Sequence, residues 1–237
     1  MDYIFNVNIL NPTIWVGELE FREPITSLTD FITALVCGAA FFSLSKKLKK
    51  VKSNEGVFLK FYFLCFFIGM TSAAFLGHAF QAYFEWEYKI IGWVFSALGQ
   101  LLLALGTLLL MKDFFKHKFY IAIYYLLLMQ FLIFIFLLIH PSYSDFKIAQ
   151  VASSAVLIGV ILPLHIFHFY KTKSSGSKYV ISAIGYALIP AYIYNNQISV
   201  NQWFNYHDIS HILMAVYMFI MYIGLSKLIA SKSSILV

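Results

Sequence analysis

The sequence predicts an all-α polytopic membrane protein, a seven-transmembrane-helix bundle with its N-terminus outside and its C-terminus in the cytoplasm. Three observations support this fold class. The chain of 237 residues is 61% hydrophobic, 19% aromatic and only 12% charged, which excludes an ordinary soluble domain. Seven apolar segments each approach the roughly 20 residues that a membrane span needs. Lysine is also concentrated in alternate loops, as in membrane proteins of fixed orientation.

The loops define the expected spans in order. Basic links at 46–52, 112–118 and 171–178 alternate with a short link at 85–89, a break at His140-Pro141 and a polar loop at 195–206. Pro190 predicts a kink near the end of the sixth span. We therefore expect spans at 27–45, 57–84, 90–111, 119–139, 146–170, 179–194 and 206–229.

Three regions follow from these spans. Residues 1–24 are acidic, contain Pro12 and Pro24, and are too short to span, so we expect an extracytoplasmic or interfacial N-terminal segment. They also lack the basic start of a cleavable signal peptide. Residues 25–231 form the seven-helix transmembrane domain, and 232–237 form a cytoplasmic tail. Cys37 and Cys65 lie inside apolar segments, which favours neither a disulfide framework nor a cysteine-based zinc site.

The lysines set the orientation. Apart from Arg22, Lys89 and Lys147, all of the 17 lysine and arginine residues flank one set of alternate loops. The positive-inside rule places those loops in the cytoplasm. Topology thus accounts for the net charge of +6, and we expect membrane lipids rather than nucleic acid as partners. The predicted location is an inner or plasma membrane of bacterial type.

Three histidines are predicted to meet near the extracytoplasmic face. His207 and His211 are four residues apart at the start of the last span, so they lie on one helix face. His78 lies six residues before the expected outer end of the second span, about 9 Å below it. Three histidines with an open fourth position are the ligands of a catalytic zinc. We therefore expect zinc at His78, His207 and His211.

A zinc centre in this position predicts hydrolysis. Zinc lowers the pKa of its bound water to about 7 and polarises a carbonyl, so that hydroxide attacks an amide or ester. A carboxylate must then move protons or orient an imidazole. Asp30 is the first candidate because it lies inside a span. Glu85 and Glu87 lie at the rim, and we expect Asp208, adjacent to His207, to face away from the metal. The competing interpretation is that membrane histidines such as His78 only form hydrogen bonds between helices. We expect His165 and His168 to be interfacial residues beside Tyr170 and Lys171 at the cytoplasmic end.

These residues resemble a known family. A histidine late in helix two, within Gly69-Met70-Thr71-Ser72-Ala73-Ala74-Phe75-Leu76-Gly77-His78, and His207-x-x-x-His211-Ile212-Leu213 in helix seven look like the CREST superfamily. That superfamily includes alkaline ceramidases and the progestin and adiponectin receptors. The resemblance implies a zinc-dependent intramembrane hydrolase of a lipid amide such as ceramide.

The chain departs from the CREST pattern at two positions. The family places a serine four residues before the helix-two histidine, where this chain has Ala74. Ser72 and Thr71 are the nearby hydroxyls, and Thr71 shares the face of His78 but is two turns away. The family also has an aspartate at the start of helix three, and no acidic residue lies between Glu87 and Asp113. These departures keep a second hypothesis open, a non-catalytic zinc-stabilised lipid-binding receptor or sensor. A third is a small transporter or haem protein. The oligomeric state stays open.

Overall fold

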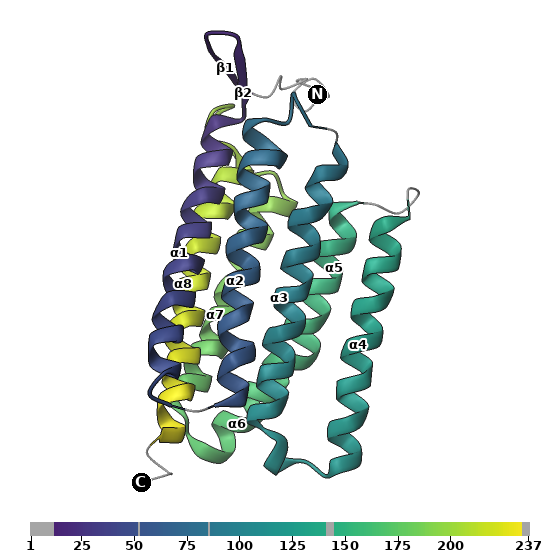
Figure 1. Cartoon of the computed structure of the whole chain (residues 1–237), viewed down its shortest axis with the longest axis vertical. Helices are drawn as coiled ribbons and strands as arrows, with labels where there is room; N and C mark the ends of the chain where they lie inside the picture. Colours follow the sequence, from purple (N-terminus) through teal and green to yellow (C-terminus); the bar gives the residue numbers. More distant parts are fainter. Residues whose placement is uncertain (1–11, 52, 85, 141–144, 234–237) are drawn as a thin grey trace.

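The computed structural model describes residues 12–51, 53–84, 86–140 and 145–233. The chain is an all-α bundle whose long helices run side by side, with one small β-hairpin at one end (Figure 1). Six of the helices in the described part are long and apolar enough to cross a membrane. The prediction of an all-α polytopic membrane protein is therefore confirmed at this level.

The helices follow the predicted order closely. Two contain a π-helical segment, labelled η1 and η4, that continues an α-helix, and two short 3₁₀ turns, η2 (Trp86–Tyr88) and η3 (Lys112–Phe114), flank α3. The bounds are α1 Pro24–Leu48, α2 Asn54–Ser72 with η1 Ala73–Ala79, α3 Lys89–Leu110, α4 His117–Ile139, α5 Phe146–Val156 with η4 Leu157–Ile161 and α6 Leu162–Thr172, α7 Ser175–Asn195, and α8 Tyr206–Ser233. Helix α8 extends two residues into the predicted tail. Helix α7 is not among the six, so the count of seven spans stays a prediction.

The basic loops share one end of the bundle. The links between α1 and α2, α3 and α4, and α6 and α7 lie at the same end as the last residues of α8, opposite the hairpin (Figure 1). We call this the basic end and the other the hairpin end. The helices pack in neighbouring pairs that place α1 between α2 and α8, with α7 on the other side of α8. The fold thus brings the second and last long helices around α1.

The N-terminal segment contains a structure that the sequence reading did not anticipate. Strands β1 (Thr13–Val16) and β2 (Leu19–Arg22) pair antiparallel, with Val16 opposite Leu19. The two-residue turn places Gly17 at φ 63°, a conformation that a residue without Cβ adopts readily. The Tyr83 hydroxyl accepts a hydrogen bond from the Glu20 backbone N–H at 2.7 Å. This contact fixes the hairpin above the end of the second span.

The second span ends earlier than predicted. We expected helix to residue 84, but η1 ends at Ala79 and residues 80–83 form turns. Phe80 packs against Phe21 of β2, with ring centroids 5.0 Å apart. The apolar residues after His78 therefore cover the hairpin instead of extending the helix. As a result His78 lies at the end of its helix, not six residues below it.

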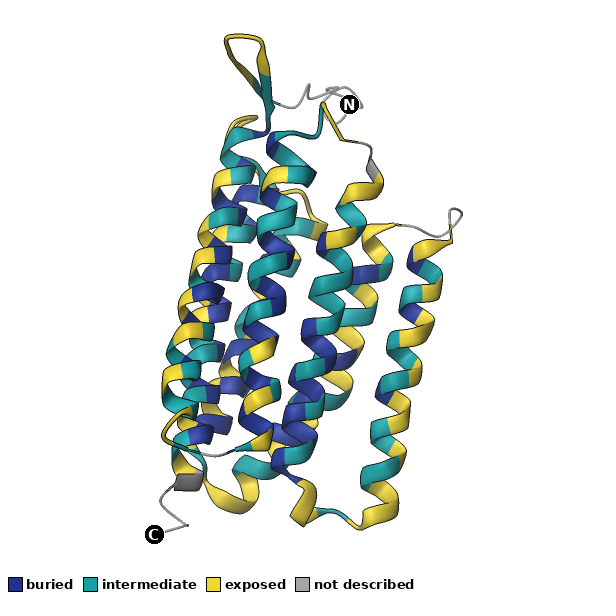
Figure 2. Cartoon of the chain, in the orientation of Figure 1, coloured by how far each residue is buried: buried dark blue, intermediate teal, exposed yellow. Residues whose placement is uncertain are grey.

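Glycines allow two pairs of helices to approach closely. A Cβ on Gly176 of α7 would lie 2.9 Å from the Gly224 carbonyl oxygen of α8, and one on Gly69 of α2 would lie 3.1 Å from the Gly92 carbonyl oxygen of α3. Such close backbone approach is typical of helix pairs in membranes. Buried residues face the centre, while exposed positions on the outer faces are largely apolar (Figure 2). This pattern fits a bundle surrounded by hydrocarbon.

Candidate functional site

Three histidine rings meet at the hairpin end of the bundle. The ring centroid of His78 lies 6.2 Å from that of His207 and 6.1 Å from that of His211, and the last two lie 6.2 Å apart. His78 belongs to η1, and the other two to the first turns of α8. The structure thus brings together the three histidines that the sequence analysis selected.

A capping box orients the start of α8. The Asn205 side chain accepts a hydrogen bond from the His207 backbone N–H at 2.8 Å, and the Asp208 carboxylate accepts one from the Asn205 N–H at 2.6 Å. These reciprocal bonds satisfy backbone donors that a helix start leaves free. Asp208 is therefore engaged in fixing the helix start, which holds His207 in place.

Asp30 of α1 faces two of the three imidazoles. Its Oδ1 atom lies 3.1 Å from His211 Nδ1, and its Oδ2 atom lies 3.5 Å from His78 Nε2. The side chain is 1% exposed, and neither oxygen has a partner in hydrogen-bonding geometry among the described residues. A buried carboxylate without donors is costly in a membrane, where no water can compensate it. Asp30 is therefore the residue in this cluster that most requires a further partner.

Glu23 joins the cluster, and the sequence analysis missed it. Its Oε2 atom accepts a hydrogen bond from His78 Nδ1 at 2.5 Å and another from the Gln81 amide at 3.2 Å. Burial alone would raise the pKa of the Glu23 carboxyl, but the hydrogen bond from His78 and the nearby imidazoles hold that pKa below its usual value. Glu23 therefore carries a negative charge beside His78.

A signal for Glu23 was present in the sequence. It precedes Asp30 by seven residues, or two helical turns, so both carboxylates fall on one face of the helix that starts at Pro24. Its backbone is left-handed, with φ 47°, which turns the chain from β2 into α1. The expectation of a mere interfacial segment for 1–24 obscured this alignment.

Threonines on α1 attach the cluster to α8. Thr33 donates a hydrogen bond to the His211 carbonyl oxygen at 2.9 Å, and the Thr29 hydroxyl lies 3.4 Å from His211 Nδ1. Both threonines and Asp30 are buried on the same face of α1. This polar stripe holds the His211 backbone and ring against Asp30.

The cluster contains side chains of the kind that ligate metals, but the described residues are not arranged around a common metal position. In the described part of the chain, no group of three or more histidine, cysteine or acidic side chains is arranged as a ligand set. The centre of the near-equilateral imidazole triangle lies about 3.6 Å from each ring centroid. With a zinc–nitrogen bond of about 2.0–2.1 Å, a liganding ring centroid would lie about 3 Å from the metal. To ligate zinc, each imidazole ring would have to rotate and move about half an ångström towards the centre of the triangle.

The remaining candidates from the sequence do not join the cluster in the described residues. Glu85 lies outside the described residues, and Glu87 is exposed in η2. Ser72 ends α2 and makes no hydrogen bond to the cluster, and Ala74 is fully buried at the position of the family serine. Of the predicted assisting residues that the structure describes, Asp30 is the one whose carboxylate faces the imidazoles of His78 and His211.

A second histidine cluster lies near the basic end. His165 is fully buried, with Nδ1 3.0 Å from the Ser177 hydroxyl and Nε2 3.3 Å from the Thr107 hydroxyl. His168 Nδ1 lies 2.7 Å from the same Ser177 oxygen. The expectation that His165 is interfacial is wrong, because its ring instead connects α6 to α3 and α7. Both histidines are distant from the first cluster, as predicted.

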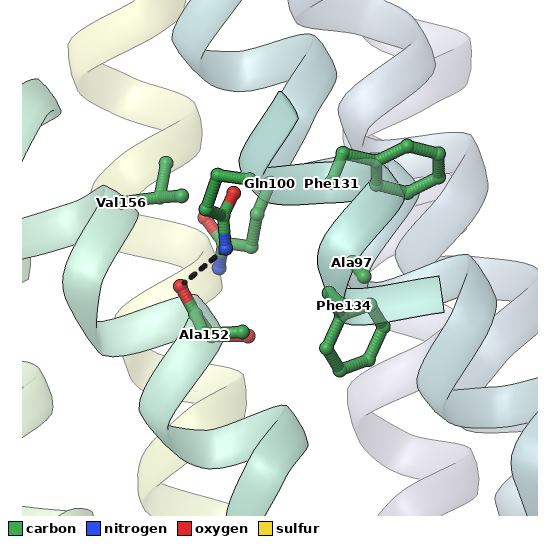
Figure 3. Close-up of a pocket in the computed structure, with 8 residues that line it drawn as sticks. Ala97, Gln100, Phe131, Phe134, Ala152 and Val156 are labelled. Carbon is green, nitrogen blue, oxygen red and sulfur yellow. Dashed lines mark hydrogen bonds between the residues drawn. The ribbon is translucent and has the colours of Figure 1, made fainter. Parts of the chain in front are cut away.

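A small polar cavity between α3, α4 and α5 does not compete as a substrate site. Gln100, Phe134, Ala152 and Val156 line it, and the Gln130 amide donates to the Ala152 carbonyl oxygen at 3.4 Å (Figure 3). Its volume of about 10 Å³ accommodates at most one water molecule. The side-chain amide oxygen of Gln100, Oε1, has no hydrogen-bond partner among the described residues, so it can accept a hydrogen bond from such a water.

Comparison with known proteins assigns the bundle to a family. The model of a family of unknown function, DUF6962, matches residues 25–230. The chain belongs to this family. No curated protein and no solved structure matches the chain. The DUF6962 match begins in the first turn of α1 and ends in the last turn of α8, so it includes Asp30 and the three histidines, whereas the hairpin and Glu23 precede it.

Proposed function

We propose that this DUF6962 protein is a zinc-dependent intramembrane hydrolase of a lipid amide or ester, similar to a ceramidase. The observation that carries the proposal is Asp30, a fully buried carboxylate whose two oxygens face imidazole nitrogens of His78 and His211 without hydrogen-bonding them. A divalent cation among these groups offsets the buried negative charge. It also accounts for three imidazoles at equal spacing in a membrane bundle.

The proposed ligands are His78, His207 and His211. Glu23 accepts the Nδ1 proton of His78, so the Nε2 lone pair of that ring is the one available to the metal. A carboxylate on the remote nitrogen is the usual partner of a metal-ligating histidine. When bound, zinc supplies a Lewis acid that polarises a carbonyl and acidifies water.

Asp30 is the proposed proton carrier. Its Oδ1 atom is 3.1 Å from His211 Nδ1, so the carboxylate is at the distance of a hydrogen bond from the ligand sphere. In this role Asp30 accepts a proton from the attacking water and returns it to the leaving amine or alkoxide. Thr29 and Thr33 hold the His211 side of the cluster during that exchange.

The proposed topology has seven spans, with α7 as the sixth. It places the basic end in the cytoplasm and the histidine cluster near the extracytoplasmic face, because lysine dominates the loops of the basic end. An inner or plasma membrane is the proposed location. Substrate lipid then reaches the cluster from the outer leaflet.

Purified protein in nanodiscs tests the hydrolase. We expect release of fatty acid from a panel of ceramides and ester lipids, abolition by a zinc chelator, and recovery on adding zinc. His211→Ala and Asp30→Asn should each abolish turnover, whereas Asp113→Asn in the exposed η3 turn should retain it. Zinc-loaded protein that hydrolyses none of these lipids contradicts the proposal.

A second function is favoured by the residues near His78. Ala74 provides no hydroxyl, and Ser72 makes no hydrogen bond to the cluster among the described residues. A zinc-stabilised lipid receptor or sensor of the same fold needs no such group. In that case His211→Ala lowers the melting temperature, and wild-type protein binds lipid without turnover. Those two results together would replace the hydrolase with the sensor.

A further inference from the structure

An apolar groove lies on the outer surface of the bundle between α4 and the α5–α6 helix. We call it the α4–α6 groove. Its volume is about 380 Å³, within the range of about 300–1,000 Å³ that small-molecule pockets occupy. It is lined by Phe115, Phe119, Ile123, Leu126, Gly159, Val160, Pro163, Leu164 and Phe167. Every lining side chain is apolar, so the groove accepts hydrocarbon.

The groove follows from an irregularity in the α5–α6 helix. The π-helical turn η4 contains Gly159, and a Cβ added there would meet nothing within 4 Å. Pro163 follows four residues later and cannot donate a hydrogen bond to the Gly159 carbonyl. The helix wall is therefore hollow at this point because Gly159 has no side chain. Interruptions of this type often mark functional positions.

Helix α4 leaves the groove open along its length. Of its described residues, Leu127, Phe134 and Leu138 are buried, and the groove-lining Phe119 and Leu126 are 53% and 52% exposed. Figure 2 shows α4 with mostly exposed and intermediate positions, set apart from the buried centre. An aromatic group at the basic end, Phe115 with its ring stacked on Phe167 at 5.5 Å, forms the groove's inner end.

Basic side chains surround that end of the groove. Lys112, Lys116 and Lys118 flank Phe115 and Phe119, and all three are exposed. Across the groove, the Lys171 ammonium lies 5.9 Å from the ring centroid of Phe167. Asp113 is the one carboxylate in residues 112–118, so the local charge is strongly positive. Basic clusters beside a membrane surface attract anionic lipid headgroups.

We propose that the α4–α6 groove binds one acyl chain of an anionic phospholipid, whose headgroup contacts Lys112, Lys116, Lys118 and Lys171. A helix with side chains is about 10 Å wide, so the groove would hold only about one turn of a second protein copy. A flexible chain fits that volume better. The site lies at the end opposite the histidine cluster, so it is independent of the hydrolase.

Native mass spectrometry of the full-length protein in detergent tests this site. The probes are phosphatidylglycerol and phosphatidylcholine with identical dioleoyl chains, supplied in equal amounts. We expect one retained lipid per chain and at least about tenfold preference for phosphatidylglycerol, because each of the four lysines favours an anionic headgroup. Changing all four lysines to glutamine should abolish the preference but not the binding of a chain.

Two substitutions fill the groove from opposite walls, and one is a matched control. Gly159→Leu and Leu126→Trp should each reduce the retained lipid to the level of nonspecific adducts. Gly185→Leu makes the same change on the exposed face of α7, where a Cβ also meets nothing within 4 Å, and should retain the lipid. Undiminished phosphatidylglycerol retention in both filled variants overturns the proposal. So does a protein dimer that those variants, and not Gly185→Leu, dissociate.

Discussion

Asp30→Asn should have opposite effects on the metal-free and the zinc-loaded protein. The substitution keeps the shape of the side chain but removes a charge that is 1% exposed and has no hydrogen-bond donor among the described residues. Burying an unpaired ion costs several kcal/mol, so removing this charge should stabilise the metal-free bundle. We expect the free energy of unfolding to rise by about 2 kcal/mol. For a chain of this size that corresponds to a rise in Tm of about 4–8 °C.

The zinc-loaded protein should respond in the opposite direction. Loss of the carboxylate beside His78 and His211 should lower the affinity of the protein for zinc about 10–100-fold. This is the usual effect of removing a group that supports metal ligands. Thermal unfolding followed by circular dichroism, with chelator and with saturating zinc, measures both effects. Titration against a competing chelator gives the affinity. Asp113→Asn is the control. A lower Tm for Asp30→Asn under both conditions, with unchanged zinc affinity, would refute the reasoning.

Three further substitutions test separate parts of the structure. Glu23→Gln should lower the affinity for zinc about 10–100-fold because His78 loses its carboxylate acceptor. Glu20→Gln, which removes the ion pair with Arg22, should leave that affinity unchanged, and competitive zinc titration measures both. Asn205→Ala should lower stability by about 1 kcal/mol through loss of the α8 cap, and an equal loss for Asn196→Ala would contradict this. Ser177→Ala should lower the free energy of unfolding by about 1–3 kcal/mol, because it removes the hydroxyl between His165 and His168, and should leave the zinc content unchanged. Ser182→Ala, on the exposed face of α7, should not change thermal unfolding.

The order of the helices could be predicted because each long apolar segment has few other stable forms in a membrane. The predicted end of the second span was wrong because Phe80, Ala82 and Phe84 continue its apolar pattern. A hydropathy pattern cannot distinguish a helix from turns that cover a hairpin. The hairpin itself depends on contacts between distant residues, such as Tyr83 with Glu20, that no local pattern contains.

The candidate site shows a similar division. Depth in the membrane was enough to bring His78, Asp30 and the α8 histidines together, because helices of known direction carry their residues to one end. Ser72 failed because it precedes His78 by six residues, which places it about 120° around a regular helix. Glu23 was missed because the sequence places the first span from residue 27 and leaves Glu23 outside the expected helix. Its alignment with Asp30 follows only when α1 begins at Pro24.

Zinc content of the purified protein tests the central claim most directly. Elemental analysis by mass spectrometry after size-exclusion chromatography in zinc-free buffer should find one zinc per chain. Joint replacement of His78, His207 and His211 by alanine should remove it, whereas replacement of His165 and His168 should not. Wild-type protein that elutes folded without zinc, and does not take it up at micromolar concentration, would contradict the account.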